Sequence, residues 1–349
     1  MSKITFIMSV YNTRTEWFER AVQSVLEQTN SNWQMIIIDD GSKEDIACQC
    51  DAFAGIDNRI KVHHQENQGL SVARNFGMDH TCSEWVTFID ADDWLEETYV
   101  NQVLEILDEH RDLELMGIGH DDIWPDRKVK QLWGEREFYR FCSSEKEGIQ
   151  MALLQDPEGL TKYPVFFGAQ WKFIYSTEFL NKYGIRNTPG LNKAQDSVFN
   201  LYVTEHAVQI GYYNKILYHY FHNNESVTGV GFNRDIDRFV KLLMAYKKFM
   251  EETVKTKMRM YEQAYIKVAL LQFEAMLQKY FLHIENPDFR KQKKETMLQV
   301  FQNEPFLCLL DARNIDGLSF YRRMLFRLMR KQCYIGICCL YKAKVFLKR

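Results

Sequence analysis

The nine residues WVTFIDADD, at positions 85–93, decide how the first part of this chain folds. Five strand-forming residues run directly into three aspartates, which is typical of a short strand covered by helices on both faces. The stretches ITFIMSVYN at 4–12 and MIIIDDGS at 35–42 repeat this pattern. An open parallel sheet forms its ligand crevice outside the carboxyl ends of its strands. The three polar ends therefore predict one site, whose carboxylates can hold a divalent metal or accept hydrogen bonds from a nucleoside.

Length and composition indicate a folded protein with a substantial core. The chain has 349 residues, which allows one large domain or two domains. Its hydrophobic fraction of 46%, its aromatic fraction of 14% and its 6 prolines argue against disorder. The net charge of −3 excludes nucleic-acid binding by the electrostatics of the whole molecule.

The cysteines and the ends of the chain predict a cytoplasmic protein. The 8 cysteines form no C-x-x-C pair and no zinc-knuckle spacing, so we expect reduced thiols. No signal peptide is expected, because Met1-Ser2-Lys3 leads straight into a strand. The longest apolar stretch near the C-terminus, residues 333–341, is too short to span a bilayer.

Strands and helices alternate over the first 120 residues. This order predicts an α/β fold with a mostly parallel sheet, right-handed crossovers and helices on both faces. The expected strands are Lys3–Val10, Trp33–Ile38, Arg59–His63, Glu84–Ile89 and Leu113–Ile118. The expected helices are Glu16–Gln28, Glu44–Phe53, Ser71–Asp79 and Glu96–Leu107.

The rest of the chain divides into an irregular middle and a helical C-terminal region. Residues 121–232 are rich in aromatic side chains, which form either a sugar platform or core. Short strands are expected at Val165–Phe167 and Gln209–Tyr212, and a helix at Ala194–His206. Residues 233–349 show apolar side chains at helical spacing and predict a helical appendage.

The basic tail, residues 319–349, is the most unusual part of the helical region. It contains nine basic residues and no acidic one, with apolar residues between the first arginines at helical spacing. A basic amphipathic helix suits an anionic membrane surface, which would place the protein on the inner face of the cell membrane. The alternative is a helix that packs on its own domain, and both interpretations remain open.

Asp90 and Asp92 form a D-x-D pattern at the end of a strand. Such a pair can hold Mg²⁺ or Mn²⁺ through one or two oxygens, with phosphates and water as the other ligands. A lone D-x-D is weak, because turns and helix N-termini also use aspartate. The position at the strand end makes the metal interpretation stronger.

Five segments in this order resemble glycosyltransferase family two, of the GT-A fold. They are SVYN at 9–12, QT at 28–29, DDGS at 39–42, NQGLSVARN at 67–75 and DADD at 90–93. The resemblance covers residues 1–125 and continues more weakly to about 230. It implies a nucleotide-sugar donor, usually UDP-linked, a divalent metal cofactor (Mn²⁺ or Mg²⁺) and an inverting transfer. Residues 1–120 would then bind the nucleotide-sugar, within a GT-A domain of residues 1–232 whose second part, 121–232, is the acceptor side.

The same resemblance implies roles for residues of the donor site. Tyr11 would stack on the base, Asp39 would accept the ring N–H of the base, and Gly69 would let the backbone approach the donor. Asp90 would lie near the ribose and Asp92 would bind the metal. The full set of expected donor-binding residues is Ser9, Tyr11, Asn12, Asp39, Asn67, Gly69, Arg74, Asp90 and Asp92.

The resemblance also identifies a catalytic base. The segment KAQDSVF at 193–199 is similar to the family segment in which an aspartate opens a helix and removes the proton of the acceptor hydroxyl. Asp196 is therefore the expected base, although Gln195 stands where the family usually has a second acid. The alternative is an aspartate that only stabilises the first turn of a helix.

Two looser matches lie on the acceptor side. Trp171 and Lys172 resemble the segment that precedes the base, so Trp171 either packs on a sugar or belongs to the core. Residues 218–228 resemble a loop that closes over the diphosphate, with Phe221 where arginine is common. His222 could then serve as a metal or phosphate partner beside Asp90 and Asp92.

The resemblance thus implies a metal-dependent, inverting hexosyl- or N-acetylhexosaminyltransferase. It would act on a hydroxyl of a glycan or a lipid-linked acceptor in the synthesis of surface polysaccharide. The alternative is a non-catalytic nucleotide-sugar binding or scaffolding module. A nucleotidyltransferase is disfavoured because residues 11–15 contain no glycine, and the lack of G-x-G-x-x-G argues against a dehydrogenase.

Overall fold

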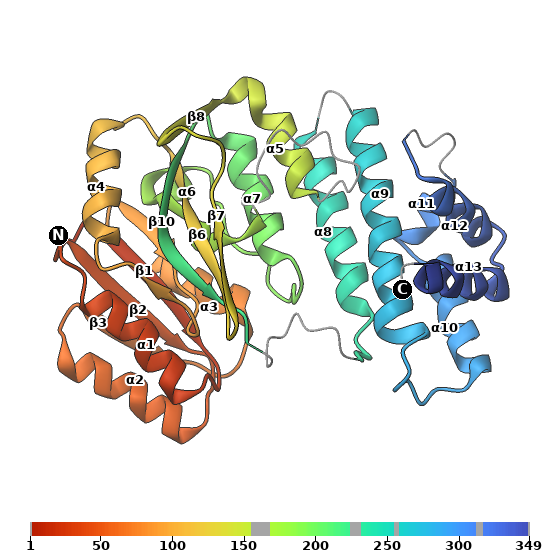
Figure 1. Cartoon of the computed structure of the whole chain (residues 1–349), viewed down its shortest axis with the longest axis horizontal. Coiled ribbons are helices and arrows are strands. Elements are labelled where there is room, and N and C mark those ends of the chain that lie inside the picture. The colour runs from red at the N-terminus through yellow and green to blue at the C-terminus, as the bar shows by residue number, and fades with distance from the viewer. Residues whose placement is uncertain (1, 155–167, 224–231, 255–257, 312–316, 348–349) are drawn as a thin grey trace. The chain divides into compact units, whose positions relative to one another are not determined.

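The computed structural model describes residues 2–154, 168–223, 232–254, 258–311 and 317–347. These divide into two compact units (Figure 1). The first contains residues 1–153 and 162–226, and the second contains residues 154–161 and 227–349.

The first unit is built on a sheet whose leading strands are parallel and follow the order β3-β2-β1-β4. These strands are β1 (Ile4–Val10), β2 (Trp33–Asp39), β3 (Ile60–His64) and β4 (Trp85–Phe88). All four lie within a few residues of their predicted positions, and the α/β prediction is confirmed. Their register sets Val10 beside Asp39, and Asp39 beside His64, at one edge of the sheet.

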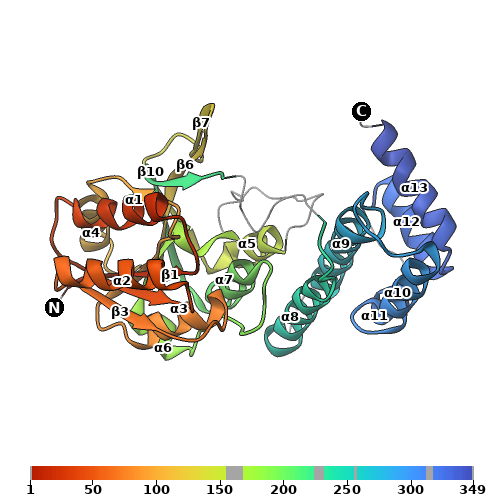
Figure 2. The same ribbon diagram turned by 90° about the horizontal axis from the view of Figure 1, so that it is seen from below.

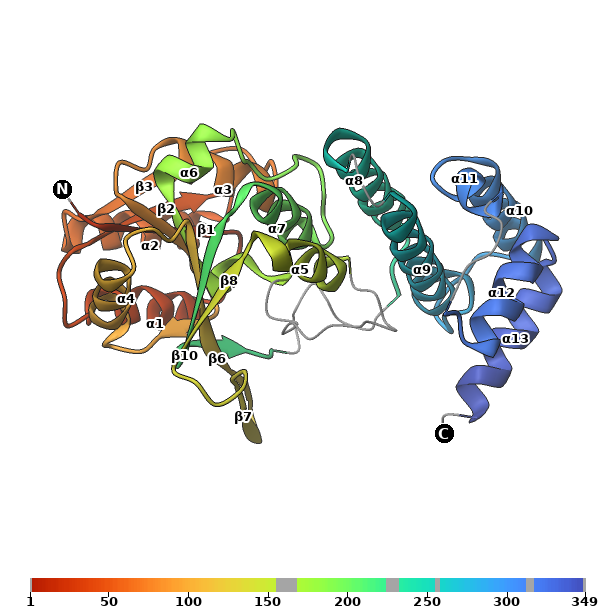
Figure 3. The same cartoon turned by 90° about the horizontal axis from the view of Figure 1, so that it is seen from above.

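Helices cover both faces of these strands. Figures 2 and 3 show α1 and α4 on one face and α3 and α6 on the other. Helix α1 turns Phe18, Ala21, Val22 and Val25 inward, because these positions lie on one side of a 3.6-residue period. The bounds are α1 (Thr15–Leu26), α2 (Glu44–Ile56), α3 (Leu70–Asp79), α4 (Tyr99–Glu109) and α6 (Thr177–Lys182).

Helix α3 packs very close to β1. A Cβ at Gly77 would lie 2.6 Å from the side chain of Ile7, so only glycine permits this approach. The helix begins after Gly69, whose φ of 86° lies in the left-handed region that favours glycine. These two glycines fix where the other residues of α3 meet the sheet.

The other half of the sheet contains antiparallel pairs, which the sequence analysis did not predict. Strand β9 (Phe173–Ser176) lies antiparallel between β4 and β6 (Leu115–Trp124). Strand β10 (Gln209–Phe221) is parallel to β6 and antiparallel to both β5 (Trp94–Leu95) and β8 (Phe138–Cys142). The predicted strands at 113–118 and 209–212 therefore exist but continue much further, and β6 also forms a hairpin with β7 (Arg127–Gln131).

The described part of the middle region also contains helices α5 and α7 and a 3₁₀ turn before β9. Helix α5 spans Lys146–Leu153 and α7 spans Gln195–His206, in agreement with the predicted helix at 194–206. The 3₁₀ turn Gln170–Lys172 directly precedes β9. The strand predicted at Val165–Phe167 lies outside the described residues.

The second unit is helical, as predicted. Helix α8 packs its buried face of Phe239, Leu242, Leu243, Tyr246 and Phe249 inside this unit. Figure 3 shows the neighbouring pairs α8–α9 and α12–α13. The helices are α8 (Asp237–Thr253), α9 (Met258–Met276), α10 (Arg290–Gln302), α11 (Phe306–Asp311), α12 (Phe320–Arg330) and α13 (Tyr334–Leu347), with a π-helical turn at Leu277–Phe281.

The sequence analysis expected reduced cysteines and an apolar stretch near the C-terminus that is too short to span a bilayer. Every cysteine whose side chain is described carries a free thiol. Among the described helices, none combines the length and the apolar character that a bilayer span requires.

Candidate active site

Arg74 of α3 is the centre of the candidate site. Its side chain is buried, with 2% exposed, and its guanidinium contacts three segments that are distant in sequence. Nη1 donates to Asp196 Oδ1 at 2.7 Å and to Gln170 Oε1 at 2.6 Å, while Nη2 donates to Asp90 Oδ1 at 2.8 Å. One arginine therefore joins the aspartate after β4 to the aspartate that opens α7.

The charged groups of this cluster shift the pKa values of one another. Burial lowers the pKa of Arg74, but the carboxylates of Asp196 and Asp90 more than offset this and hold the pKa above its ordinary value. Burial raises the pKa of Asp90, Arg74 opposes that change, and the charge of Asp196 adds to it. A guanidinium is matched to two carboxylates because its five N–H groups form a rigid fork.

Asp92 lies in the same acidic loop and is held by other partners. Its Oδ2 accepts a hydrogen bond from Asn223 Nδ2 at 2.7 Å, and its carbonyl oxygen accepts one from Arg20 Nη2 at 2.6 Å. Burial, together with the charge of Asp90, raises the pKa of Asp92 to about 6. The loop thus concentrates negative charge beyond what its own cations neutralise.

Asp93 has a structural place that the sequence did not indicate. It is fully buried, and its carboxylate accepts hydrogen bonds from Tyr218 Oη at 2.6 Å and from the backbone N–H of Phe221 at 2.7 Å. Burial raises its pKa well above the usual range. Asp93 therefore ties the acidic loop to β10.

Asp39 ends β2 on the nucleoside side of the predicted site. Its side chain is buried, Oδ1 accepts the backbone N–H of Ser42 at 2.9 Å, and Oδ2 lies 2.8 Å from His64 Nδ1. Burial raises its pKa, yet the hydrogen bonds from Ser42 and His64 prevail and keep the pKa below its ordinary value. Asp39 is thus held as a carboxylate.

The neighbouring residues of β1 differ in how they are engaged. Ser9 Oγ is buried and has no hydrogen-bond partner in the described part of the chain, whereas Tyr11 is exposed. Asn12 has a φ of 50°, donates its backbone N–H to Ser42 Oγ (3.0 Å), and accepts the Lys43 N–H at its Oδ1 (2.9 Å). Asn12 therefore braces the loop after β2.

Asp40 organises the loop that leads into α3. Its Oδ1 accepts from Gln65 Nε2 at 2.7 Å and from the Gln68 N–H at 2.9 Å, and its Oδ2 accepts from the Gly69 N–H at 2.8 Å. Asn67 is exposed on this loop, and the space where Gly69 would carry a Cβ is open. The sequence analysis did not predict this contact.

The structure places Trp171 in an aromatic stack. Only 5% of it is exposed, and its ring lies on Tyr218 at 4.2 Å and on Tyr220 at 5.3 Å between centroids. Lys172 Nζ lies 5.0 Å from the Trp171 ring, and burial lowers the pKa of this ammonium to about 8. Of the two interpretations left open, these contacts favour core packing for Trp171.

His222 is engaged away from the acidic loop. Its Nε2 lies 2.8 Å from Asp122 Oδ1, and its ring stacks on Trp124 at 4.0 Å. The residue that contacts Asp92 is its neighbour Asn223. Within the described residues, no group of three or more His, Cys, Asp or Glu side chains is arranged to hold a metal ion.

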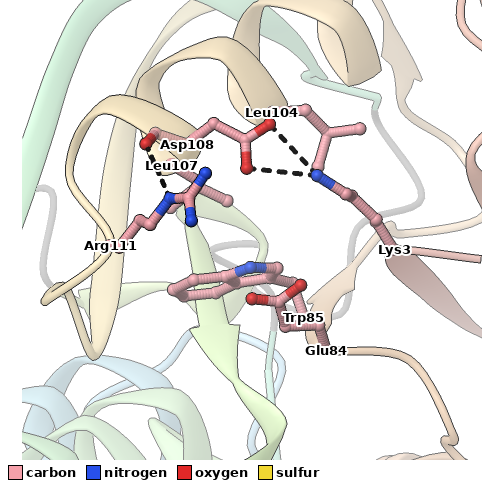
Figure 4. A pocket seen from close by; sticks show the side chains of 7 residues that line it. All are labelled: Lys3, Glu84, Trp85, Leu104, Leu107, Asp108 and Arg111. Carbon is pink, nitrogen blue, oxygen red and sulfur yellow. Dashed lines mark hydrogen bonds and ion pairs between the residues drawn. The ribbon is translucent and has the colours of Figure 1, made fainter.

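A cavity of about 250 Å³ lies at the other end of the parallel strands (Figure 4). Lys3 before β1 and Trp85 at the start of β4 line it, with Asp108 and Arg111 from the end of α4. Lys3 Nζ contacts both carboxylate oxygens of Asp108 at 3.1 Å. Because this cavity is at the amino ends of the strands, it is separate from the candidate site.

Comparisons with known proteins agree with this fold. Residues 5–173 match the family described as glycosyl transferase family 2. The putative glycosyltransferase EpsH of Bacillus subtilis (strain 168) is 39% identical over 110 residues, which is 32% of each chain. The uncharacterized glycosyltransferase EpsJ of the same organism is 24% identical over 238 residues, 68% of this chain and 66% of that protein.

A third relative and the solved structures extend the comparison. Glycosyltransferase GlyA of Streptococcus pneumoniae is 37% identical over 109 residues, 31% of this chain and 16% of that protein. The chain thus spans a third or less of the length of EpsH and GlyA. The crystal structure of S. aureus TarS 1-349 in complex with UDP-GlcNAc has a TM-score of 0.69 at 15% identity, over 98% of this chain and 91% of that chain, and it is similar in fold.

Proposed function

Because the chain belongs to glycosyl transferase family 2 through its residues 5–173, we propose that it transfers a sugar from a nucleotide-sugar to a hydroxyl group with inversion. The observation that supports this most directly is the bridge that Arg74 makes between Asp90 and Asp196. Through this bridge, Asp90 of the acidic loop and Asp196, which is suited to remove a proton, contact the same buried guanidinium. A binding module has no need for the second carboxylate.

The proposed donor is a UDP-linked hexose or N-acetylhexosamine. Asp39, buried and ionised, is suited to accept the ring N–H of a uracil base. Ser9 Oγ, buried near the end of β1 without a partner among the described residues, is available for a further hydrogen bond. The exposed ring of Tyr11 is available to stack on the base. UDP and UDP-GlcNAc are the ligands named for the TarS structures of similar fold, which supports this donor class.

Asp92, with Asp90, would hold the divalent cation that the family resemblance implies. The residues fit such an ion, because burial, and then the charge of Asp90, raises the pKa of Asp92 to about 6, and a cation would favour the ionised form of both carboxylates. A bound divalent cation neutralises charge that builds on a departing diphosphate. His222 is engaged by Asp122 and Trp124, so this assignment rests on the carboxylates.

Asp196 is the proposed general base. Arg74 Nη1 orients its Oδ1 at 2.7 Å, and the backbone N–H of Gln170 contacts its Oδ2 at 3.3 Å. In the proposed step the acceptor oxygen bonds to the anomeric carbon and the bond from that carbon to the diphosphate breaks. The acceptor proton passes to Asp196, and the diphosphate leaves with the bonding electrons.

The basic tail is proposed to hold the enzyme on an anionic membrane near a lipid-linked or glycan acceptor. Arg322 and Lys344 are bound to the buried Glu274, so they fasten α12 and α13 to α9. By contrast, Arg323, Arg327 and Arg330 are exposed along one side of α12. Large apolar side chains are exposed on the same two helices: Phe320, Ile335, Val345, Phe346 and Leu347. Exposed cations beside apolar side chains suit an anionic lipid surface.

The direct experiment is a transfer assay with defined UDP-sugars. We expect one UDP-sugar to be consumed with release of UDP in the presence of Mn²⁺ and an acceptor extract, and we expect EDTA to stop the release. Mass spectrometry would identify the glycosylated product, and its anomeric configuration would test inversion. No product with any UDP-sugar, although UDP binds, would favour the binding module.

A further inference from the structure

We propose that His64 is a positioning residue for the nucleobase of the donor, holding the Asp39 carboxylate in the orientation that accepts the base. Asp51 of α2 holds the other side of the imidazole. This inference rests on the proposed function, in which Asp39 accepts the ring N–H of the base. It adds a residue to which the sequence analysis gave no functional role.

Three different elements bring these side chains together. Asp39 and His64 are paired residues at the ends of the parallel strands β2 and β3. His64 Nδ1 lies 2.8 Å from Asp39 Oδ2, and its Nε2 lies 3.1 Å from Asp51 Oδ1. The imidazole therefore bridges two carboxylates, one from the sheet and one from helix α2.

The two carboxylates differ sharply in exposure. The Asp39 side chain is 4% exposed, whereas the Asp51 side chain is 68% exposed and that of His64 is 42% exposed. Asp39 Oδ1 is taken by the Ser42 N–H, so His64 supplies the contact seen on Oδ2. Removing His64 would leave a buried oxygen without that donor and allow the carboxylate to turn.

The network also makes nucleotide affinity depend on protonation. Hydrogen bonds to Asp39 and then to Asp51 raise the pKa of His64 above its ordinary value. A protonated imidazole donates to both carboxylates, while a neutral one donates to one of them only. The buried thiol of Cys50 also lies near Asp39 and Asp51, and it stays neutral because burial raises its pKa to about 12.

The expected direction of the pH effect follows from these contacts. Nucleotide binding favours the state in which Asp39 is held most firmly, and that is the state with protonated His64. Affinity should therefore be highest below the raised pKa of His64 and should fall as the pH increases through it. By linkage, a bound nucleotide should raise the pKa of His64 further.

The experiment measures the Kd of UDP by calorimetry between about pH 6 and pH 8.5, the range in which a histidine changes charge. His64→Ala should weaken binding about tenfold, because a charged hydrogen bond to a buried acceptor is lost. His64→Asn places an amide N–H near the position of Nδ1, so it should bind UDP at all pH values within about twofold of the tightest wild-type value, without the histidine pH dependence. Ionisation of UDP itself contributes the same pH dependence for every variant. The difference in pH dependence between wild-type protein and His64→Asn therefore reports on the histidine.

Two further variants separate positioning from a general structural effect. Asp51→Asn removes one carboxylate and should move the pH dependence to lower pH while the Kd at low pH changes little. His63→Asn is the matched control, because His63 stacks on Phe76 instead of contacting Asp39. In the NMR spectrum, UDP should shift the titration of the one histidine resonance that His64→Asn removes.

The outcomes separate this inference from the proposed function. If wild-type protein binds UDP and His64→Ala binds it equally well at every pH, the role of His64 is overturned and the donor class stands. The role is also overturned if His64→Asn keeps the wild-type pH dependence. If wild-type protein does not bind UDP at all, the proposed donor and this inference both fail.

Discussion

The arginines of the candidate site and those of the basic tail carry the same charge in opposite surroundings. Arg74 is buried and contacts two carboxylates and a glutamine. Arg323 and Arg327 on α12 are exposed, and neither forms an ion pair with another residue that the structure describes. The difference teaches that a buried, fully paired charge holds a site in shape, while an exposed charge is available to a partner.

The two surroundings also predict different energies. Removing one member of a buried ion pair leaves an uncompensated charge and costs about 3–5 kcal/mol, whereas an exposed pair contributes about 0–1 kcal/mol. The comparison is therefore testable by substitutions of the same chemical type in both regions.

The largest effect is expected for Arg74→Gln. It leaves Asp90 and Asp196 facing each other without their shared cation, so the free energy of unfolding should fall by about 3–5 kcal/mol. Urea unfolding measures this change. The matched control is Arg186→Gln, which breaks a more exposed pair with Asp79 and should cost about 1 kcal/mol or less. Equal losses for the two variants would contradict the larger contribution expected from the buried charge of Arg74.

A second substitution tests the acidic loop. At 100 times its Kd, UDP should stabilise wild-type protein by about 2.7 kcal/mol in total. Asp92→Asn should abolish the part of this stabilisation that depends on Mn²⁺. Thermal unfolding with and without EDTA measures it. His222→Gln is the companion variant, because His222 contacts Asp122 instead of Asp92, and it should keep the Mn²⁺ effect. If His222→Gln loses the Mn²⁺ effect and Asp92→Asn keeps it, the cation does not bind at Asp92.

The smallest effect per residue is expected in the basic tail. Replacing Arg323, Arg327 and Arg330 together by Gln should weaken binding to vesicles that contain phosphatidylserine about 100-fold, at about 1 kcal/mol per residue. Sedimentation with the vesicles measures it. Replacing Arg290, Lys291 and Lys294 of α10 by Gln removes the same charge from exposed positions of another helix and is the control. Equal loss in both variants would indicate a net-charge effect without a specific tail surface.

The sequence predicted the parallel half of the sheet because its strands are short, apolar and separated by helices of clear period. Strand β4 and its three aspartates, for example, lie where the pattern placed them. The antiparallel half depends on pairings such as β4 with β9, nearly ninety residues apart, for which no local pattern exists. Strand β10 pairs with β6, which is also distant in sequence, so its full length could not be predicted from local patterns.

Within the site, the sequence predicted residue types better than partners. Asp196 and Arg74 were both expected from the family resemblance, but their contact across 122 residues follows only from the fold. Gln170 sits in a segment without a regular period, so no signal singled it out. Trp171 carried two interpretations, and its buried stack on Tyr218 became visible only with β10 in place.

The central claim is that Asp196 accepts a proton at the site where the donor is bound. The most direct measurement is the donor Kd together with the rate of sugar transfer for Asp196→Asn, which keeps the size of the side chain. We expect a donor Kd within about twofold of that of wild-type protein and a loss of transfer rate of about 10²–10⁴-fold. Transfer at the wild-type rate by Asp196→Asn would contradict it.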